Sequence, residues 1–131
     1  NIGFGLQGLT KASKLNKVRE LLQLVGLPDL GQRYIHQLSG GQQQRVAIAR
    51  AIAGSPSLIL ADEPTGNLDS RNAQLVMELL DSLHKDGATI CMVTHDPRSA
   101  RHAKRVIELF DGQLVADSAL SATAEVAYAA V

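Results

Sequence analysis

The chain has 131 residues, of which 45% are hydrophobic, and its 13 basic side chains balance 13 acidic ones. This length permits one domain with a modest core. The neutral balance argues against nucleic-acid binding, because proteins that bind a phosphate backbone carry an excess of positive charge. No apolar stretch approaches the roughly 20 residues that span a bilayer, so any membrane association is expected to come through a partner.

The first predicted helix covers Ser13–Val25, where apolar side chains recur on one face and Gly26 is placed to end the helix. That face consists of Leu15, Val18, Leu22 and Val25. A helix with one apolar stripe packs that stripe against the rest of its domain.

A second helix is predicted to begin within Leu38–Gln42, whose sequence is Leu-Ser-Gly-Gly-Gln, and to run to about Ala53. Ser39 and Gln42 fit the Ser-x-x-Gln capping box. A helix N-terminus offers free backbone N–H groups to a phosphate, the two glycines let an anion approach closely, and the Ser39 hydroxyl adds a donor. The simpler interpretation is a Gly-Gly turn that only begins a helix.

The continuous apolar run Leu58–Ala61 predicts a central parallel strand covered on both faces. Asp62 and Glu63 follow at its carboxyl end, which is where ligands bind in open α/β sheets. Because successive side chains diverge, one acid can hold Mg²⁺, directly or through water, while the next orients and deprotonates an attacking water. The simpler interpretation is a solvated acidic turn after a strand.

The segment Thr89–Thr94 repeats the buried-strand pattern, and His95 follows at its carboxyl end. A histidine there can donate a hydrogen bond to a terminal phosphate. Taken alone, it is more often a loop histidine without a chemical role. Cys91, the only cysteine, lies inside the apolar run and is expected to be a core residue without a disulfide or metal role.

A third helix is predicted between these strands, from a cap at Ser70 to about Leu83, with Gly87 after its end. Its expected buried stripe consists of Ala73, Val76, Met77, Leu80 and Leu83.

The end of the chain predicts a hairpin followed by a tail. Asp111-Gly112 separates Val106–Phe110 from Gln113–Val115 and is a two-residue turn signal, so a short antiparallel pair is expected. The tail from Asp117 is rich in Ala and Ser and is expected to be a frayed helix or disordered.

In this order and spacing, the motifs resemble those of an ABC ATPase. Leu38–Gln42 is similar to the ABC signature motif, Leu58–Glu63 to the Walker B strand, Gly66–Asp69 to the D-loop, and His95 to the switch histidine. The resemblance runs from about Asn1 to Val115. It implies an α/β fold of the P-loop NTPase (RecA-like) class, with a mostly parallel sheet, flanking helices and part of the ABC helical subdomain.

The resemblance also implies roles for individual residues. Asp62 would support Mg²⁺, Glu63 would polarise the hydrolytic water, and His95 would contact the γ-phosphate. Asp69 would lie on the interface of a head-to-tail dimer of nucleotide-binding subunits. The residues implied to contact ATP held mainly by the opposing subunit are Ser39, Gly40, Gly41 and Gln42.

Compared with the family, the sequence lacks the Walker A loop and the Q-loop. No Gly-x-x-x-x-Gly-Lys-Ser/Thr loop is present, and such a loop would cradle the phosphates. Gly3–Gly8 formally fits Gly-x-Gly-x-x-Gly but has no strand before it, so we reject it as a dinucleotide motif. The chain therefore resembles the carboxyl-terminal portion of a nucleotide-binding domain, and by itself it is expected to bind ATP poorly and to hydrolyse it negligibly.

On this resemblance the chain has three regions. Residues 1–54 belong to the helical subdomain with the signature motif, residues 55–116 to the RecA-like core, and residues 117–131 to a weakly ordered tail.

The sequence of Asp62–Asp69 resembles that of the branch that includes lipoprotein-releasing, macrolide-export and cell-division ABC systems. The implied function is that of an ATP-hydrolysing subunit, with ATP and Mg²⁺, which powers export or extraction through an integral membrane permease. Such a subunit is cytoplasmic and peripheral at the inner face of the cell membrane. The alternatives are a soluble ABC ATPase of translation or DNA repair, against which Gln42 and Gly66-Asn67 argue, and a non-catalytic remnant that only pairs with another protein.

Overall fold

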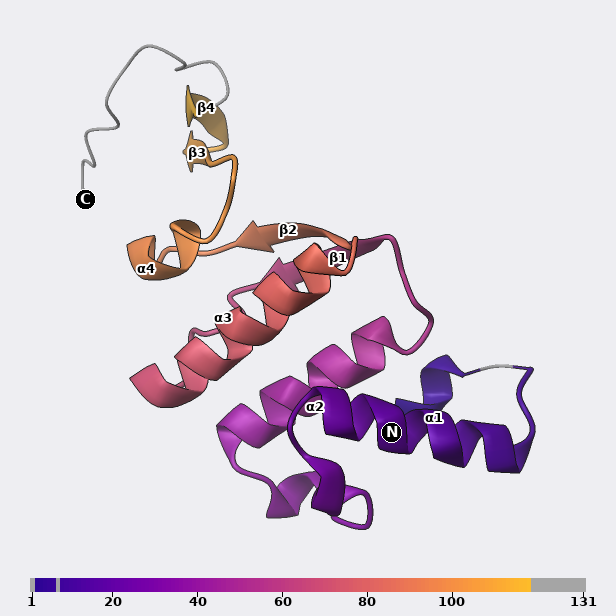
Figure 1. Ribbon diagram of the computed structural model, residues 1–131. Coiled ribbons are helices and arrows are strands. Elements are labelled where there is room, and N and C mark those ends of the chain that lie inside the picture. The colour runs from indigo at the N-terminus through magenta and orange to yellow at the C-terminus, as the bar shows by residue number, and fades with distance from the viewer. Residues whose placement is uncertain (1, 7, 119–131) are drawn as a thin grey trace. The chain divides into compact units, whose positions relative to one another are not determined.

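The computed structural model describes residues 2–6 and 8–118 (Figure 1). The chain divides into two compact units, Asn1–His95 and Asp96–Val131, which are described separately. The first unit contains the 3-10 helices η1 (Ile2–Gly5), η2 (Pro28–Leu30) and η3 (Ile35–Gln37), the helices α1 (Lys11–Leu24), α2 (Gly40–Ile52) and α3 (Ser70–Lys85), and the strands β1 (Leu58–Asp62) and β2 (Thr89–Val93). The second contains α4 (Pro97–Ala100), β3 (Ile107–Phe110) and β4 (Gln113–Asp117).

Helix α1 begins two residues earlier than the sequence predicted, because the Thr10 hydroxyl caps it by accepting a hydrogen bond from the Ser13 backbone N–H. Gly26 ends it in the left-handed region, at φ 68°. Its buried stripe is shifted from the predicted one. Leu15 is 48% exposed, and the core side is formed by Val18, Leu21, Leu22 and Val25, which follow the i, i+3, i+4, i+7 spacing.

Helix α2 confirms the predicted capping box. The Ser39 hydroxyl accepts a hydrogen bond from the Gln42 N–H at 3.4 Å, and the Gln42 side chain accepts one from the Ser39 N–H at 3.0 Å. The helix ends at Ile52, one residue before the predicted end. Its buried residues are Gly41, Val46, Ile48, Ala49 and Ile52.

Helix α3 is capped by Asp69, and the prediction that Ser70 is the cap is wrong. The Asp69 carboxylate accepts hydrogen bonds from the backbone N–H groups of Arg71 and Asn72, so Ser70 becomes the first helical residue. The predicted stripe is buried at four positions, with Ala73 half-buried and Leu79 buried in addition. The buried members are Val76, Met77, Leu79, Leu80 and Leu83.

Strands β1 and β2 pair in parallel, with Leu58 opposite Thr89 and Asp62 opposite Val93. Helix α3 connects the two strands and packs beside β2 (Figure 1). The strands therefore end at the same edge of the sheet, as the sequence predicted, and this edge carries the candidate site.

The two faces of this sheet differ. Ile59 is 6% exposed and belongs to the hydrophobic core, against which Ile90 and Met92 pack. On the opposite face Leu60 is 75% exposed, and Cys91 next to it is also exposed. The predictions of a strand covered on both faces and of Cys91 as a core residue are therefore wrong for the described chain, because strand side chains alternate and only one face is packed.

The second unit is built around the β3–β4 hairpin. Asp111 and Gly112 both have positive φ, at 47° and 74°, which is the conformation that two-residue hairpin turns require. The guanidinium of Arg105 forms a bidentate pair with the Asp117 carboxylate, at 3.0 and 2.6 Å, and this pairing raises the pKa of Arg105. Asp117 is thus the buried last residue of β4 rather than the first residue of a tail, and the tail prediction for 119–131 lies outside the described residues.

Among the described residues, no helix combines the length and apolar character needed to cross a membrane.

Candidate nucleotide-binding site

Glu63 follows β1 in a backbone conformation that L residues rarely adopt, with φ 43°. Its N–H still donates to the Val93 carbonyl at 2.9 Å, which extends the pairing with β2 by one bond. Its own carbonyl accepts from the Gly66 N–H at 3.1 Å and closes a tight turn. Such a conformation persists where surrounding bonds hold it, and outliers of this kind cluster at functional sites.

Both carboxylate oxygens of Glu63 bind the segment that follows β2. Oε1 lies 2.7 Å from His95 Nδ1 and accepts from the His95 backbone N–H at 2.9 Å. Oε2 accepts from the Thr94 hydroxyl at 3.3 Å. The hydrogen bond from the His95 side chain is the largest cause that lowers the pKa of Glu63, against a smaller opposing effect of burial. The carboxylate is therefore ionised at neutral pH.

This contact fixes the protonation of one ring nitrogen of His95. An ionised carboxylate only accepts hydrogen bonds, so His95 Nδ1 carries the proton that faces Glu63. The side chain of His95 is 84% exposed, which leaves Nε2 open to a ligand. If Nε2 is to donate as well, the ring must hold both protons and be cationic.

Asp62 lies on the exposed face of the sheet, opposite Val93, while Glu63 is directed to the end of β2. The divergence of the two acids that the sequence predicted is thus present. Among the described residues, no group of three or more His, Cys, Asp or Glu side chains could hold a metal ion. A single exposed carboxylate nevertheless fits Mg²⁺, which is commonly held by one or two protein carboxylates with substrate phosphates and water.

The two glycines at the start of α2 differ in their surroundings. A Cβ at Gly40 would have its nearest neighbour at 3.9 Å, in the side chain of Leu68. Gly41 is buried, and a Cβ there would come within 2.5 Å of the Asn72 side chain. Close approach of an anion is therefore less obstructed at Gly40, while Gly41 lets α2 pack against α3.

Asp69 holds the start of α3, and Asn72, which binds it, contacts Gly41 at the start of α2. Its Oδ1 accepts from the Arg71 and Asn72 N–H groups at 3.0 Å, and its Oδ2 accepts from Asn72 Nδ2 at 2.6 Å. The bond from the Asn72 backbone is the largest cause that lowers the pKa of Asp69, followed by the bond from the Asn72 side chain.

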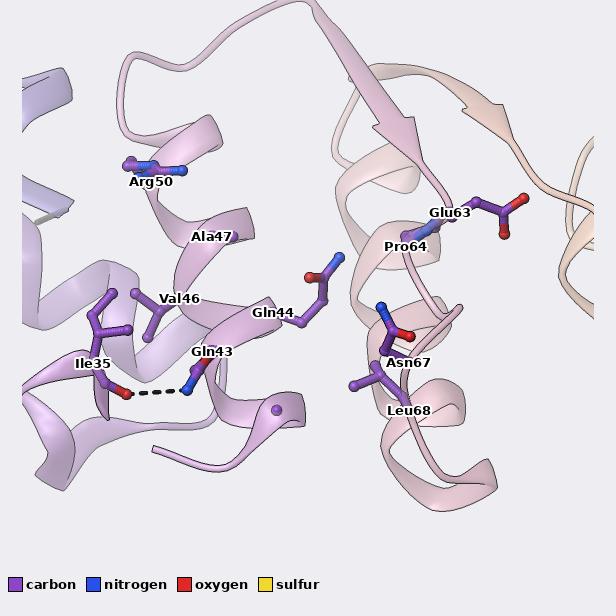
Figure 2. A pocket seen from close by; sticks show the side chains of 11 residues that line it. Ile35, Gln43, Gln44, Val46, Ala47, Arg50, Glu63, Pro64, Asn67 and Leu68 are labelled. Atoms are coloured by element: carbon purple, nitrogen blue, oxygen red, sulfur yellow. Dashed lines mark hydrogen bonds between the residues drawn. The ribbon is translucent and has the colours of Figure 1, made fainter. Parts of the chain in front are cut away.

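A cleft of about 390 Å³ separates α2 from the turn after β1. Figure 2 shows Gln44 directed from α2 toward this turn, with Asn67 and Leu68 on the opposite wall. The side chain of Glu63 points away from α2 (Figure 2). One copy of the chain thus brings Glu63 together with His95 and links Asp69 to the signature segment through Asn72, but it does not direct the Glu63 carboxylate to the signature segment.

Sequence reasoning missed two side chains that shape the site. Thr94 binds Glu63, and its only signal is its place directly before His95. Asn72 binds Asp69, and the Asp-x-x-Asn spacing across a helix start could have predicted that bond.

The sequence matches the family described as ABC transporter over residues 5–66. Over 105 residues, 80% of the chain, it is 51% identical to an ABC transporter ATP-binding protein of Methanocaldococcus jannaschii, MJ1508, of which it covers 47%. It is 52% identical over 108 residues, 82% of the chain, to the macrolide export ATP-binding/permease protein MacB of Escherichia coli strain K12, of which it covers 17%.

Among solved structures, the chain is similar to the dimeric ABC transporter cassette MJ0796 in a post-hydrolysis state bound to ADP and Pi. The TM-score is 0.74 and the sequence identity 41%, and the match covers 84% of the chain and 48% of that protein. The fold is that of a P-loop NTPase. Within that class the chain belongs to the ABC transporter family, and it carries part of the ATP-binding domain. It spans about half the length of MJ1508.

Proposed function

We propose that the complete protein to which this chain contributes hydrolyses ATP and that Glu63 is its general base. The observation that carries the proposal is the bond network of Glu63, whose carboxylate is held at the shared edge of β1 and β2 by His95 at 2.7 Å and by Thr94. An ionised carboxylate at this edge can orient a water molecule and accept its proton. Asp62, next to it and exposed, would bind the Mg²⁺ that neutralises phosphate charge.

In this proposal His95 contacts the γ-phosphate. Its Nδ1–H is engaged by Glu63, so the contact uses Nε2 and requires the doubly protonated ring. A cationic imidazole beside the terminal phosphate also stabilises the negative charge there.

The proposed site is shared between two copies. Ser39, Gly40, Gly41 and Gln42 would contact the nucleotide held by the other copy, and Asp69 would lie at the interface. Two observations support this: the Glu63 side chain points away from α2, and the similar cassette MJ0796 is dimeric. The Ser39 hydroxyl oxygen accepts from Gln42, so its own hydrogen is available to a phosphate.

The protein's proposed role is to power transport through a membrane permease, with the ATPase held at the inner face of the membrane by that partner. Support comes from the similarity to MacB, an ATP-binding/permease protein for macrolide export. This similarity also favours the exporter-type branch over a soluble ATPase of translation or DNA repair.

The test is Mg-dependent ATP turnover of the complete protein beside the 131-residue chain. We expect turnover in the complete protein alone, because the chain has no phosphate-cradling loop. ATP turnover by the 131-residue chain itself would overturn the expectation that the chain needs a phosphate-cradling loop from the rest of the protein. Absence of turnover from both proteins would overturn the ATPase proposal.

Glu63→Gln in the complete protein tests the assigned base, with Glu78→Gln on the exposed side of α3 as the matched control. Removal of a positioned general base lowers the rate by about 10²–10⁴-fold, so Glu63→Gln should retain ATP in a closed dimer while Glu78→Gln turns over normally. Wild-type turnover in Glu63→Gln would show that Glu63 is not the base.

A further inference from the structure

The third residue of α3, Asn72, fills the space above the second glycine of the signature segment. A Cβ on Gly41 would lie 2.5 Å from Asn72 Cγ and Oδ1 and 2.8 Å from Asn72 Cβ. Ordinary van der Waals contacts of a Cβ begin at 3.4 Å. Because the Asn72 Cβ is attached to the α3 backbone, rotation of the side chain alone would not make room.

The same side chain holds the carboxylate of Asp69. Asn72 Nδ2 donates to Asp69 Oδ2 at 2.6 Å, and the Asn72 backbone N–H donates to Oδ1 at 3.0 Å. Asn72 therefore packs its Cβ, Cγ and Oδ1 on the first turn of α2 and binds the cap of α3 through Nδ2 and its backbone N–H. A shift of one of these elements changes the contact that fixes the other.

We propose that Asn72 is a positioning residue that couples the start of α2 to the Asp69 carboxylate. This inference rests on the proposed function, in which the start of α2 meets a nucleotide and Asp69 meets the second copy. Movement of the signature segment on nucleotide engagement would then displace Asp69 through Asn72. The absence of a side chain at position 41 serves this packing.

The first experiment removes the hydrogen bond and keeps the packing. Asn72→Asp in the complete protein preserves the shape that rests on Gly41, but it replaces the donor with a carboxylate beside Asp69. We expect kcat for Mg-ATP to fall about fivefold or more and the Hill coefficient to fall toward one, with KM changed less than about twofold.

Arg71→Ala is the control for this variant, because the Arg71 side chain is exposed and only its backbone N–H takes part in the cap. It should keep the wild-type kcat and Hill coefficient. A wild-type kcat and Hill coefficient in Asn72→Asp would overturn the coupling.

The second experiment is a double-mutant cycle in the complete protein, with Gly41→Ala, Asn72→Ala and the double variant. Thermal unfolding gives the Tm of each variant. Gly41→Ala should lower Tm, and adding Asn72→Ala should restore part of the loss, because it removes Cγ and Oδ1 but leaves the Asn72 Cβ at 2.8 Å. Gly40→Ala is the matched control for stability, since its nearest neighbour is at 3.9 Å. Two results would contradict the packing of Asn72 on Gly41 as the reason for glycine at position 41. One is a Tm of Gly41→Ala equal to that of Gly40→Ala, and the other is a double variant whose Tm is no higher than expected from the sum of the two single losses.

The two experiments separate this inference from the proposed function. A wild-type protein without ATP turnover would refute the proposed function, while the Tm cycle would still decide whether Asn72 imposes the glycine at position 41. Normal wild-type turnover with unchanged kinetics in Asn72→Asp would refute the coupling alone.

Discussion

The two faces of the β1–β2 sheet carry similar residues in different surroundings. On the inner face Ile59 is 6% exposed and lies in the core, whereas its neighbour Leu60 on the outer face is 75% exposed. Leu58 and Val93 are also exposed on the outer face. Strands that meet water on one face alternate apolar and polar residues, but β1 is apolar on both sides from Leu58 to Ala61.

The sequence of β1 therefore suits a strand with two covered faces, although only one face is packed in the described residues. Parallel sheets are almost always covered on both faces. The chain covers 48% of the similar cassette MJ0796. We therefore expect another part of the complete protein to cover the outer face.

The largest expected effect comes from placing the same charge on each face of β1. In the 131-residue chain, Ile59→Asp should destabilise the fold by about 4 kcal/mol or more, because an unpaired carboxylate would enter the core. Leu60→Asp should change stability by less than about 0.5 kcal/mol, because the position already meets water. Urea unfolding followed by circular dichroism measures both, and equal losses would mean that the faces do not differ.

In the complete protein the second face should become a core. There Leu60→Asp should lower the free energy of unfolding by about 3 kcal/mol, while the apolar replacement Leu60→Met should cost less than about 1.5 kcal/mol. Thermal or denaturant unfolding of the complete protein gives both values. A harmless Leu60→Asp in that protein would show that the outer face stays in water.

Cys91 provides a smaller, non-disruptive measure of the same covering. It is exposed on the outer face, so a maleimide should label it readily in the 131-residue chain. In the complete protein we expect this labelling to be about tenfold slower or more. Mass spectrometry of the peptide that contains Cys91 measures the rate in both proteins. Equal rates in the two proteins would contradict a covered face.

Local signals in the sequence predicted the elements well. The capping box of Ser39 and Gln42 is complete within four residues, and Asp111-Gly112 adopts the positive φ values that a two-residue turn needs. Patterns of this kind are decided by neighbours along the chain. Leu15 and Cys91 were assigned wrongly because their burial depends on what packs against them, which periodicity alone does not specify.

The candidate site was predictable in part for the same reason. The rule that ligands lie beyond the ends of parallel strands brought Glu63 and His95 to one edge, and the structure joins them at 2.7 Å. The contact of Asn72 with Gly41 was not predictable, because it depends on how closely α2 and α3 approach. The assignment of Asp69 or Ser70 as cap was equally open, since both side chains can cap a helix.

The smallest expected effect concerns Glu63 at the shared carboxyl end of β1 and β2. It is a pH dependence of the free energy of unfolding. The pKa of Glu63 is lowered from its ordinary value of 4.5 in the folded chain, chiefly by the His95 side chain. The bound carboxylate therefore stabilises the fold above pH 4.5, and this contribution is lost as the pH falls through the lowered pKa. A glutamine at position 63 does not titrate, so Glu63→Gln should lack this part of the loss of stability in acid.

Urea unfolding of the 131-residue chain and of Glu63→Gln, from about pH 6 to about pH 3, measures this contribution. The stability difference between the two should be constant above pH 4.5 and should shrink below it. The effect is small because the Glu63 side chain is 35% exposed and solvent screens its charge. A difference that stays constant to the lowest pH would mean that the bonds from His95 and Thr94 do not stabilise the ionised carboxylate. The packing of the inner face alone would then fix the geometry at the carboxyl end of the two strands.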